Sequence, residues 1–300
     1  MNWRGRRNTI GFVYQYYDRH SLSIYQKTPR HKNGKTGHEV SLSKKSTVEP
    51  LYFDSITSNF NFDNYSASAI GKYWLNSRIN IDFGGMFIYE EYEQIDNALE
   101  LPMKSFDFIK YQARSSITYN YVNQHYEFFD GLKLKLYGET IQTVKYPNAS
   151  FVKVTGELKY FKRLNKKGNL ALHYKFGIAT NNKSPFSPFV LDGFINIRGI
   201  GNRVSRGTAE NILNIEYRHT LLNKKHFTLQ SAIFTDIGSL RQPGADFKTI
   251  LHSSELNYFS GIGLRIHSKF FYKAIFRIDY SVNLTNINHG GFSFGLGHFF

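Results

Sequence analysis

Apolar and polar side chains alternate along most of this chain. In the segment 273–283 the two faces carry Ala274, Phe276, Ile278, Tyr280 and Val282 against Arg277, Asp279, Ser281 and Asn283. Successive side chains of a β-strand point to opposite faces, so a period of two residues predicts a strand. The same alternation recurs upstream, in the segments 79–89, 111–120, 152–160, 170–178 and 213–218. The 3.6-residue period of a helix is missing, and we predict an all-β protein.

Fourteen strands are predicted, separated by turns rich in Asn, Gly and Lys. They start near residues 8, 20, 37, 60, 77, 105, 131, 150, 168, 209, 226, 257, 273 and 290. Many extend over roughly ten to fifteen residues, whereas strands of soluble proteins usually have about five or six and a tilted membrane strand needs about nine to eleven. Neither a linker nor a shift in composition divides the chain, so we expect a single domain over residues 1–300.

The polar faces of these strands decide between the competing β architectures. A soluble sandwich or propeller would also accommodate fourteen strands. Its core, however, would have to bury charged residues of neighbouring strands, such as Glu216, Arg265 and Asp279. In a membrane barrel, apolar side chains face lipid, polar side chains face a wet lumen, and closure pairs every strand edge. We therefore predict a transmembrane antiparallel β-barrel of 14–16 strands.

Composition and charge restrict the partners. The chain contains 38 Lys and Arg residues, 23 Asp and Glu residues and no Cys. A basic balance points to polyanionic partners. Because the basic residues are scattered rather than gathered in a helix or stripe, we expect contact with outer-membrane lipids and lipopolysaccharide phosphates, and not with nucleic acid. The lack of Cys excludes disulfides and thiolate metal sites, and the sequence has no run of 18 apolar residues that would form a transmembrane helix.

The first residues, MNWRGRRNTIGFVYQYY, lack the apolar core and cleavage site of a signal peptide. An outer-membrane protein requires such a signal for export. We therefore expect this chain to be a processed or excised piece of a longer protein, with the N-terminal part of the barrel truncated.

The last predicted strand, residues 290–300, resembles the C-terminal recognition strand of outer-membrane proteins. That pattern contains a polar residue, a glycine and a terminal aromatic residue at the spacing of Ser293, Gly295 and Phe300. His298 stands where a hydrophobic residue is usual. The alternation places five residues on one face: Phe292, Phe294, Leu296, His298 and Phe300. We expect the strand to continue to the last residue.

A long interruption, residues 183–208, breaks the strand rhythm in the C-terminal half. Loops of this length are usually functional or disordered. Its centre is apolar and its tip carries Arg198-Gly199, so we expect it to pack against the rest of the protein. Gly199 is expected at a backbone position that needs a positive φ or a close approach.

This loop and the strands after it resemble the BamA/TamA family of outer-membrane assembly barrels. In that family the sixth extracellular loop folds into the lumen with a hydrophobic-Arg-Gly-aromatic tip, followed by an Asn-x-Glu-x-Arg strand and a Phe-x-Asp-x-Gly strand. The corresponding residues are Ile197, Arg198, Gly199 and Ile200, with Ile200 replacing the aromatic residue, then Asn214, Glu216 and Arg218, then Phe234, Asp236 and Gly238. Five strands follow the loop, as in the family, and nine precede it where the family has eleven. The POTRA repeats of the family are absent from this sequence.

An Arg inside a barrel needs a carboxylate partner, because an unpaired buried charge is very costly. The alternation puts Asp236 on the inner face together with Gln230 and Phe234. We expect Arg198 to pair with Asp236 in bidentate geometry, with Glu216 on the neighbouring strand as a second partner. The alternative is an exposed loop Arg and an unrelated lumen Asp.

The resemblance implies that the barrel assists insertion or translocation of proteins at the outer membrane of a Gram-negative bacterium, through a weak seam between its first and last strands. The implied partners are client outer-membrane or secreted proteins and periplasmic accessory proteins. We expect no catalytic residue, metal or cofactor, since the sequence has no metal-type His pair, phosphate loop or dinucleotide fingerprint. The alternative is a passive or substrate-selective, porin-like channel, because a pinned loop also plugs a porin.

Overall fold

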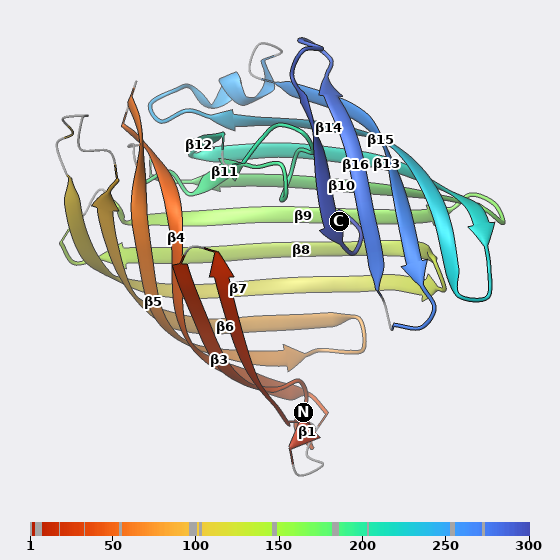
Figure 1. Ribbon diagram of the computed structural model, residues 1–300. Helices are drawn as coiled ribbons and strands as arrows, with labels where there is room; N and C mark the ends of the chain where they lie inside the picture. The colour runs from red at the N-terminus through yellow and green to blue at the C-terminus, as the bar shows by residue number, and fades with distance from the viewer. Residues whose placement is uncertain are drawn as a thin grey trace. The chain divides into compact units, whose positions relative to one another are not determined.

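The structure is a computed structural model that describes residues 2–300 except for 4–7, 18, 33, 54–55, 96–100, 102–103, 146–148, 182–185, 203, 253–255 and 272–273. Its strands form one sheet whose order follows the chain, from β1 to β10 and then from β13 to β17 (Figure 1). Strands β11 and β12 form a separate antiparallel pair. In the described part of the chain, no helix has both the length and the apolar character needed to cross a membrane.

The strands before the long loop are β1 (Asn2–Trp3), β2 (Asn8–Tyr17), β3 (Arg19–Thr28), β4 (Thr36–Phe53), β5 (Ile56–Trp74), β6 (Ile79–Gln94), β7 (Ser105–His125), β8 (Phe128–Thr143), β9 (Phe151–Arg163) and β10 (Gly168–Ala179). The later ones are β11 (Phe189–Leu191), β12 (Ser205–Gly207), β13 (Ala209–Asn223), β14 (Phe227–Arg241), β15 (Asn257–Ser268), β16 (Ile275–Asn283) and β17 (Gly290–Leu296). All fourteen predicted strands are therefore confirmed, and none starts more than four residues from its predicted position.

The chain forms two compact units. The first consists of Met1–Thr118, Leu136–Val154 and Ala179–Ser187, and the second of Tyr119–Lys135, Thr155–Ile178 and Pro188–Phe300.

In the first unit the strands expose apolar side chains on one face and pair polar ones on the other. Phe12 and Leu42 are 66% and 61% exposed, whereas Ser41 and Ser68 share a hydrogen bond of 2.7 Å across β4 and β5. Lys110 forms an ion pair of 2.6 Å with the buried Glu90. A separate apolar core joins strands β4 to β7 with the loop before β7, through Leu51, Phe60, Phe62, Tyr92, Leu101, Phe106 and Phe108. This unit thus combines a local aromatic core with a polar strand face.

In the second unit the burial pattern is the reverse of that of a water-soluble protein. On β16 the apolar side chains Phe276 and Ile278 are exposed, while Arg277 and Asp279 are buried. Every second residue of β13 from Glu210 to Thr220 is buried, on the face that we call the polar face. Such inversion, with apolar groups outside and charges inside, is what a lipid-facing sheet requires.

The last strand is shorter than the alternation predicts. Strand β17 ends at Leu296, because Gly297 has a φ of +89° and turns the chain out of the ladder. The expectation that His298 and Phe300 share a face with Phe292 on a strand that continues to the last residue is therefore wrong. Residues 297–300 form instead a short segment, which we call the tail, whose aromatic rings contact Phe129, His173 and Arg198.

Candidate functional site: a loop pinned to the polar face

The long loop contains the β11–β12 hairpin, which packs against β13 and β14. Beyond β11 the chain forms a tight turn around Asp192 and Asn196. The Asn196 side chain accepts from the Asp192 backbone N–H at 2.8 Å and donates to the Val190 carbonyl at 2.7 Å. These bonds close the turn from within and leave the tip, residues 197–200, directed at the sheet.

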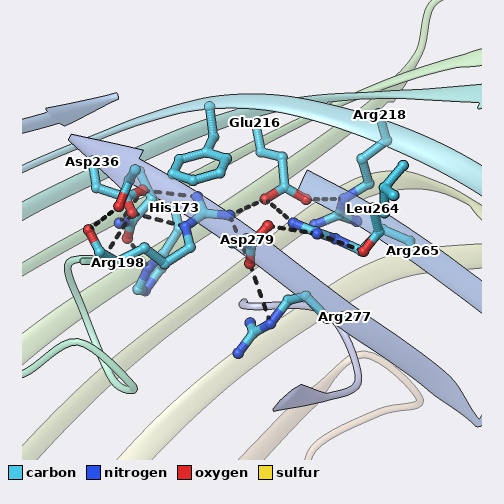
Figure 2. A network of polar contacts seen from close by, with 12 residues as sticks. His173, Arg198, Glu216, Arg218, Asp236, Leu264, Arg265, Arg277 and Asp279 are labelled. Carbon is cyan, nitrogen blue, oxygen red and sulfur yellow. Dashed lines mark hydrogen bonds and ion pairs between the residues drawn. The ribbon is translucent and has the colours of Figure 1, made fainter. Parts of the chain in front are cut away.

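Arg198 inserts from this tip into the polar face and is fully buried. Its Nε and Nη2 donate to the two carboxylate oxygens of Asp236 at 2.8 and 2.9 Å, and its backbone N–H donates to Oδ2 at 3.0 Å (Figure 2). Asn214 on β13 donates to the same carboxylate at 2.9 Å and to the Asn196 carbonyl at 2.8 Å. The structure thus brings Arg198 and Asp236 together in bidentate geometry, which adds orientation to charge.

Glu216 connects this pair to a second set of charges. It accepts from Arg198 Nη1, from Arg218 Nε at 2.5 Å and from Arg265 Nη2 at 3.0 Å. Arg265 in turn donates to Asp279 at 2.6 Å (Figure 2). We call Arg198, Glu216, Arg218, Asp236, Arg265, Arg277 and Asp279 the charge network. It contains four guanidinium groups and three carboxylates, so it carries one excess positive charge.

Burial sets the electrostatics of the tip. Removal from water alone would lower the pKa of Arg198, because burial disfavours the charged form. The hydrogen bonds to Asp236 and the charges of Asp236, Glu216 and Asp279 outweigh this effect and raise the pKa above its usual value. The guanidinium therefore stays charged, and the loop is held by an ion pair at any pH at which the carboxylates are ionised.

Two aromatic rings contact the Arg198 guanidinium. The Phe234 ring lies 3.4 Å from Arg198 Cζ and the Phe299 ring of the tail lies 4.4 Å from it. Phe299 also lies 4.9 Å from the Cζ atom of Arg277. Cation–π contacts of this kind strengthen when water is excluded. Within the Phe-x-Asp-x-Gly motif, Phe234 thus contacts the same cation that Asp236 neutralises.

Two glycines make room for the tip. A Cβ at Gly238 would lie 2.5 Å from Ile197 Cδ1 and 2.7 Å from Ile212 Cδ1, and a Cβ at Gly199 would overlap the Ser281 hydroxyl oxygen. Gly199 has a φ of +82°, and Ser281 donates to the Arg198 carbonyl at 2.7 Å. Each glycine therefore admits a close approach that a side chain would block.

We predict that Gly238→Ala destabilises the pinned loop. The added methyl group must displace the buried Ile197, and overpacking a tight core typically costs about 1–3 kcal/mol. Limited proteolysis should show cleavage of the loop between residues 192 and 204 at protease concentrations that spare the parent protein. Gly138→Ala, at a position on β8 with open space around its Cβ, is the control; equal protection of both variants would contradict the prediction.

The remaining predicted site residues, apart from Ile200, lie near the end of the chain. Ser293 is buried on β17, and a Cβ at Gly295 would lie 2.5 Å from Arg277 Nη2. The His298 ring lies 5.3 Å from the Phe129 ring, and the Phe300 ring stacks on His173 at 5.3 Å. Ile200, the last residue of the tip, is half-buried. Ser293 and Gly295 thus lie on β17 opposite Asp279 and Arg277, whereas His298 and Phe300 lie in the tail.

Sequence reasoning did not assign Arg265, Asp279 or Phe299 to the site, and it used Arg218 only as a motif residue. Arg265 and Asp279 lie at polar positions of alternating strands, so the alternation identified their face but not their partners. No group of three or more His, Cys, Asp or Glu residues in the described part of the chain has the arrangement of a metal site.

Comparison with known proteins identifies this architecture. Residues 2–300 match the model of the Omp85 superfamily domain, and no curated protein matches the sequence significantly. The structure resembles that of BamA from Haemophilus ducreyi lacking POTRA domains 1–3, with a TM-score of 0.73 and 12% identity over 98% of this chain and 64% of that chain. It also resembles CdiB from Escherichia coli (TM-score 0.63, 10% identity, 92% of this chain and 52% of that chain) and CdiB from Acinetobacter baumannii (0.63, 12%, 92% and 50%). The predicted antiparallel barrel fold is thereby confirmed, and the chain spans less than two thirds of the length of each of these proteins.

Proposed function

Because this chain belongs to the Omp85 superfamily, we propose that it is an outer-membrane barrel of the BamA/TamA type that assists the insertion or translocation of client proteins through a weak seam at its last strand. The proposal treats residues 1–300 as one barrel domain in the outer membrane of a Gram-negative bacterium, with residues 183–208 in its lumen. Client outer-membrane or secreted proteins, periplasmic accessory proteins and lipopolysaccharide are the proposed partners.

The pinned tip is the observation that carries this proposal. Besides the β11–β12 hairpin, this loop contributes one Arg that is bound by two carboxylates from neighbouring strands, Asp236 and Glu216. Such a bond fixes the position of the loop, which the mere narrowing of a channel does not require. A buried ion pair is weak evidence for stability, and we take as our hypothesis that this one specifies a unique arrangement of loop and strands. We propose that Arg198, Gly199, Glu216 and Asp236 hold the strands on the C-terminal side of the sheet in one register while β17 moves.

Strand β17 has the properties that a mobile seam strand needs. It pairs with β16 over seven residues, from Gly290 to Leu296, whereas β13 and β14 pair over fourteen. Its sequence includes Gly290, Gly291 and Gly295, and glycine weakens a strand because it packs no side chain. An edge that separates easily offers backbone groups with which an incoming strand pairs.

A photo-crosslinking experiment tests this role. A photoreactive phenylalanine analogue at Phe294, on the exposed face of β17, should crosslink to a newly made barrel protein during its insertion into proteoliposomes containing this chain. The same analogue at Ile262, exposed on the interior strand β15, is the control, because an interior strand has no edge to offer. Equal crosslinking from both positions, or none during productive insertion, would rule out β17 as the client-pairing strand.

A further inference from the structure

In the first unit, the face of β5 that lies opposite the polar strand face changes from polar to apolar partway along the strand. We call it the outward face. Side chains two residues apart share a face, and both ladders of β5 are continuous here. Towards the β4–β5 turn the outward face carries Asn59, Asn61 and Asp63, and beyond them it carries Tyr65, Ala67 and Ala69. The lipid-facing belt of this unit therefore ends between Asp63 and Tyr65.

The other face of β5 changes in the opposite sense at the same level. Its Ser66 and Ser68 side chains hydrogen-bond to serines of β4, whereas Phe60 and Phe62 are buried in the aromatic core. A barrel strand is apolar outside and polar inside only within the membrane, so this exchange of faces marks a membrane surface. At this boundary the ring centroids of Tyr65 and of a tyrosine on β6 lie 6.1 Å apart, and tyrosines are enriched at the headgroup level.

The boundary is the edge of the belt that faces the longer connections between strands. The connection from Gln94 to Ser105 joins β6 to β7 at this end, whereas only residues 75–78 join β5 to β6 at the other end. Membrane barrels have short periplasmic turns and longer extracellular loops. In the outer-membrane placement proposed above, the boundary at Tyr65 therefore lies in the outer leaflet.

A groove of about 380 Å³ lies on the outward face at this boundary, within the range of roughly 300–1,000 Å³ that is common for ligand pockets. Its lining comes from strands β3 to β6 and includes Ile24, Leu42, Lys44, Tyr65, Ala67 and Phe87. Ala67 lies in register between Leu42 and Phe87, so its small side chain leaves a gap between two larger ones. Because lipid tails are as apolar as leucine, such a groove holds an acyl chain through van der Waals packing.

Lys44 is the one charged residue that lines the groove. Its ammonium group lies 5.3 Å from the centroid of the Tyr65 ring, and it forms no ion pair with an acidic residue in the described part of the chain. The carboxylates just beyond the boundary have other partners: Asp63 lies 3.7 Å from Arg19, and Glu91 accepts from a tyrosine hydroxyl at 3.0 Å. A free cation at the surface end of an apolar groove matches a lipid whose negative headgroup lies above its acyl chains.

We propose that this groove, which we call the lipid groove, binds lipopolysaccharide, with one acyl chain against Ala67 and a phosphate group of the lipid on Lys44. The inference goes beyond the proposed function and rests only on its placement of the chain in the outer membrane. A lipid bound in this way sets the depth of the first unit in the outer leaflet, because its phosphate and its acyl chain are held at fixed levels of the same strands.

The test measures binding of lipid A, the phosphorylated acyl anchor of lipopolysaccharide, to the purified protein in detergent micelles by native mass spectrometry. Diphosphorylated lipid A should bind about 5-fold more tightly than the same lipid without its phosphates, the contribution expected of one Lys at a membrane surface. Added salt should reduce this preference. Equal affinity for the two lipids would overturn the proposal. Displacement of lipid A by inorganic phosphate at millimolar concentration would also overturn it, because it would indicate a general anion site.

Two pairs of variants locate the bound lipid. Lys44→Gln should abolish the preference for the phosphorylated lipid, whereas Lys45→Gln, which removes an exposed charge from the opposite face of β4, should keep it. Ala67→Leu should weaken the binding of both lipids and keep the preference, because it fills the groove and removes no charge. Its control is Ala113→Leu, the same change at an exposed position of β7 outside the groove. Equal effects within either pair would overturn the assignment to this groove.

Client crosslinking from β17 measures the proposed function separately, because none of these four positions lies on that strand. If clients crosslink in the parent protein while Lys44→Gln keeps the full preference for phosphorylated lipid, only the lipid groove proposal fails. If no client crosslinks while Lys44→Gln loses that preference, the lipid groove stands and the proposed function fails.

Discussion

Replacing Arg198 with alanine is expected to release the loop from the polar face and to abolish client insertion. The change leaves the Asp236 carboxylate buried without the guanidinium that it pairs with, and it removes one of the three guanidinium groups that contact Glu216. Removing one partner of a buried pair typically costs about 3–5 kcal/mol. The strand ladders do not depend on this residue, so the barrel should still migrate as a folded, heat-modifiable species. Limited proteolysis should then cleave between residues 192 and 204, within a segment that the parent protein protects.

Two further variants separate charge from geometry. Arg198→Lys keeps the charge but cannot donate to both oxygens of Asp236 and to Glu216 at once, so it should restore little protection. Arg198→Gln/Asp236→Asn removes both charges and should be less damaging than Arg198→Ala, because no carboxylate of that pair remains unpaired. Lys248→Ala is the control, because it removes one cation from an exposed position outside the charge network. Full loop protection in Arg198→Ala would show that the ion pair does not hold the tip.

The alternation predicted the positions of fourteen strands because each strand separates two different environments. On β14 the outward Ile233 is 58% exposed while Gln230, Phe234 and Asp236 are buried, and one period in the sequence determines both faces. The same alternation put Asp236 on the buried face of β14, and this prediction used no knowledge of its contacts. The position of a strand and the face to which each of its side chains points are local properties, so both can be predicted from a single sequence.

The charge network could not be predicted to the same extent, because it depends on the register between strands. Asn214 lies opposite Asp236 across β13 and β14, and Gln230 lies opposite Arg265 across β14 and β15. If the pairing of β13 with β14, or of β14 with β15, shifted by two residues, each side chain would still point to the same face of the sheet. Glu216 and Arg265 would, however, no longer lie close together. The tail shows a different limit, since the alternation continues through Phe300 while the left-handed backbone of Gly297 ends the strand.

The double variant Phe299→Ala/Phe300→Ala is expected to loosen β17. The two rings connect the end of this strand to Arg198, Arg277 and His173. Each cation–π contact contributes about 0.5–2 kcal/mol. Both rings are half-buried, so the burial of each adds less than the roughly 1.5–3 kcal/mol of a fully buried side chain. Hydrogen exchange of the β17 amides in nanodiscs should therefore become at least about 10-fold faster, since about 1.4 kcal/mol corresponds to a factor of ten.

The matched control removes two other phenylalanine rings, from the exposed face of β17. Phe292→Ala/Phe294→Ala truncates residues that are 66% and 61% exposed and do not contact the charge network, so the exchange of β17 should change little in lipid. If the tail retains β17, the Phe299→Ala/Phe300→Ala variant should also crosslink more client from position 294, because the strand edge separates more often. Faster exchange without increased crosslinking would mean that the tail stabilises β17 without gating access to it. Unchanged exchange would mean that seven residues of pairing with β16 hold the strand unaided.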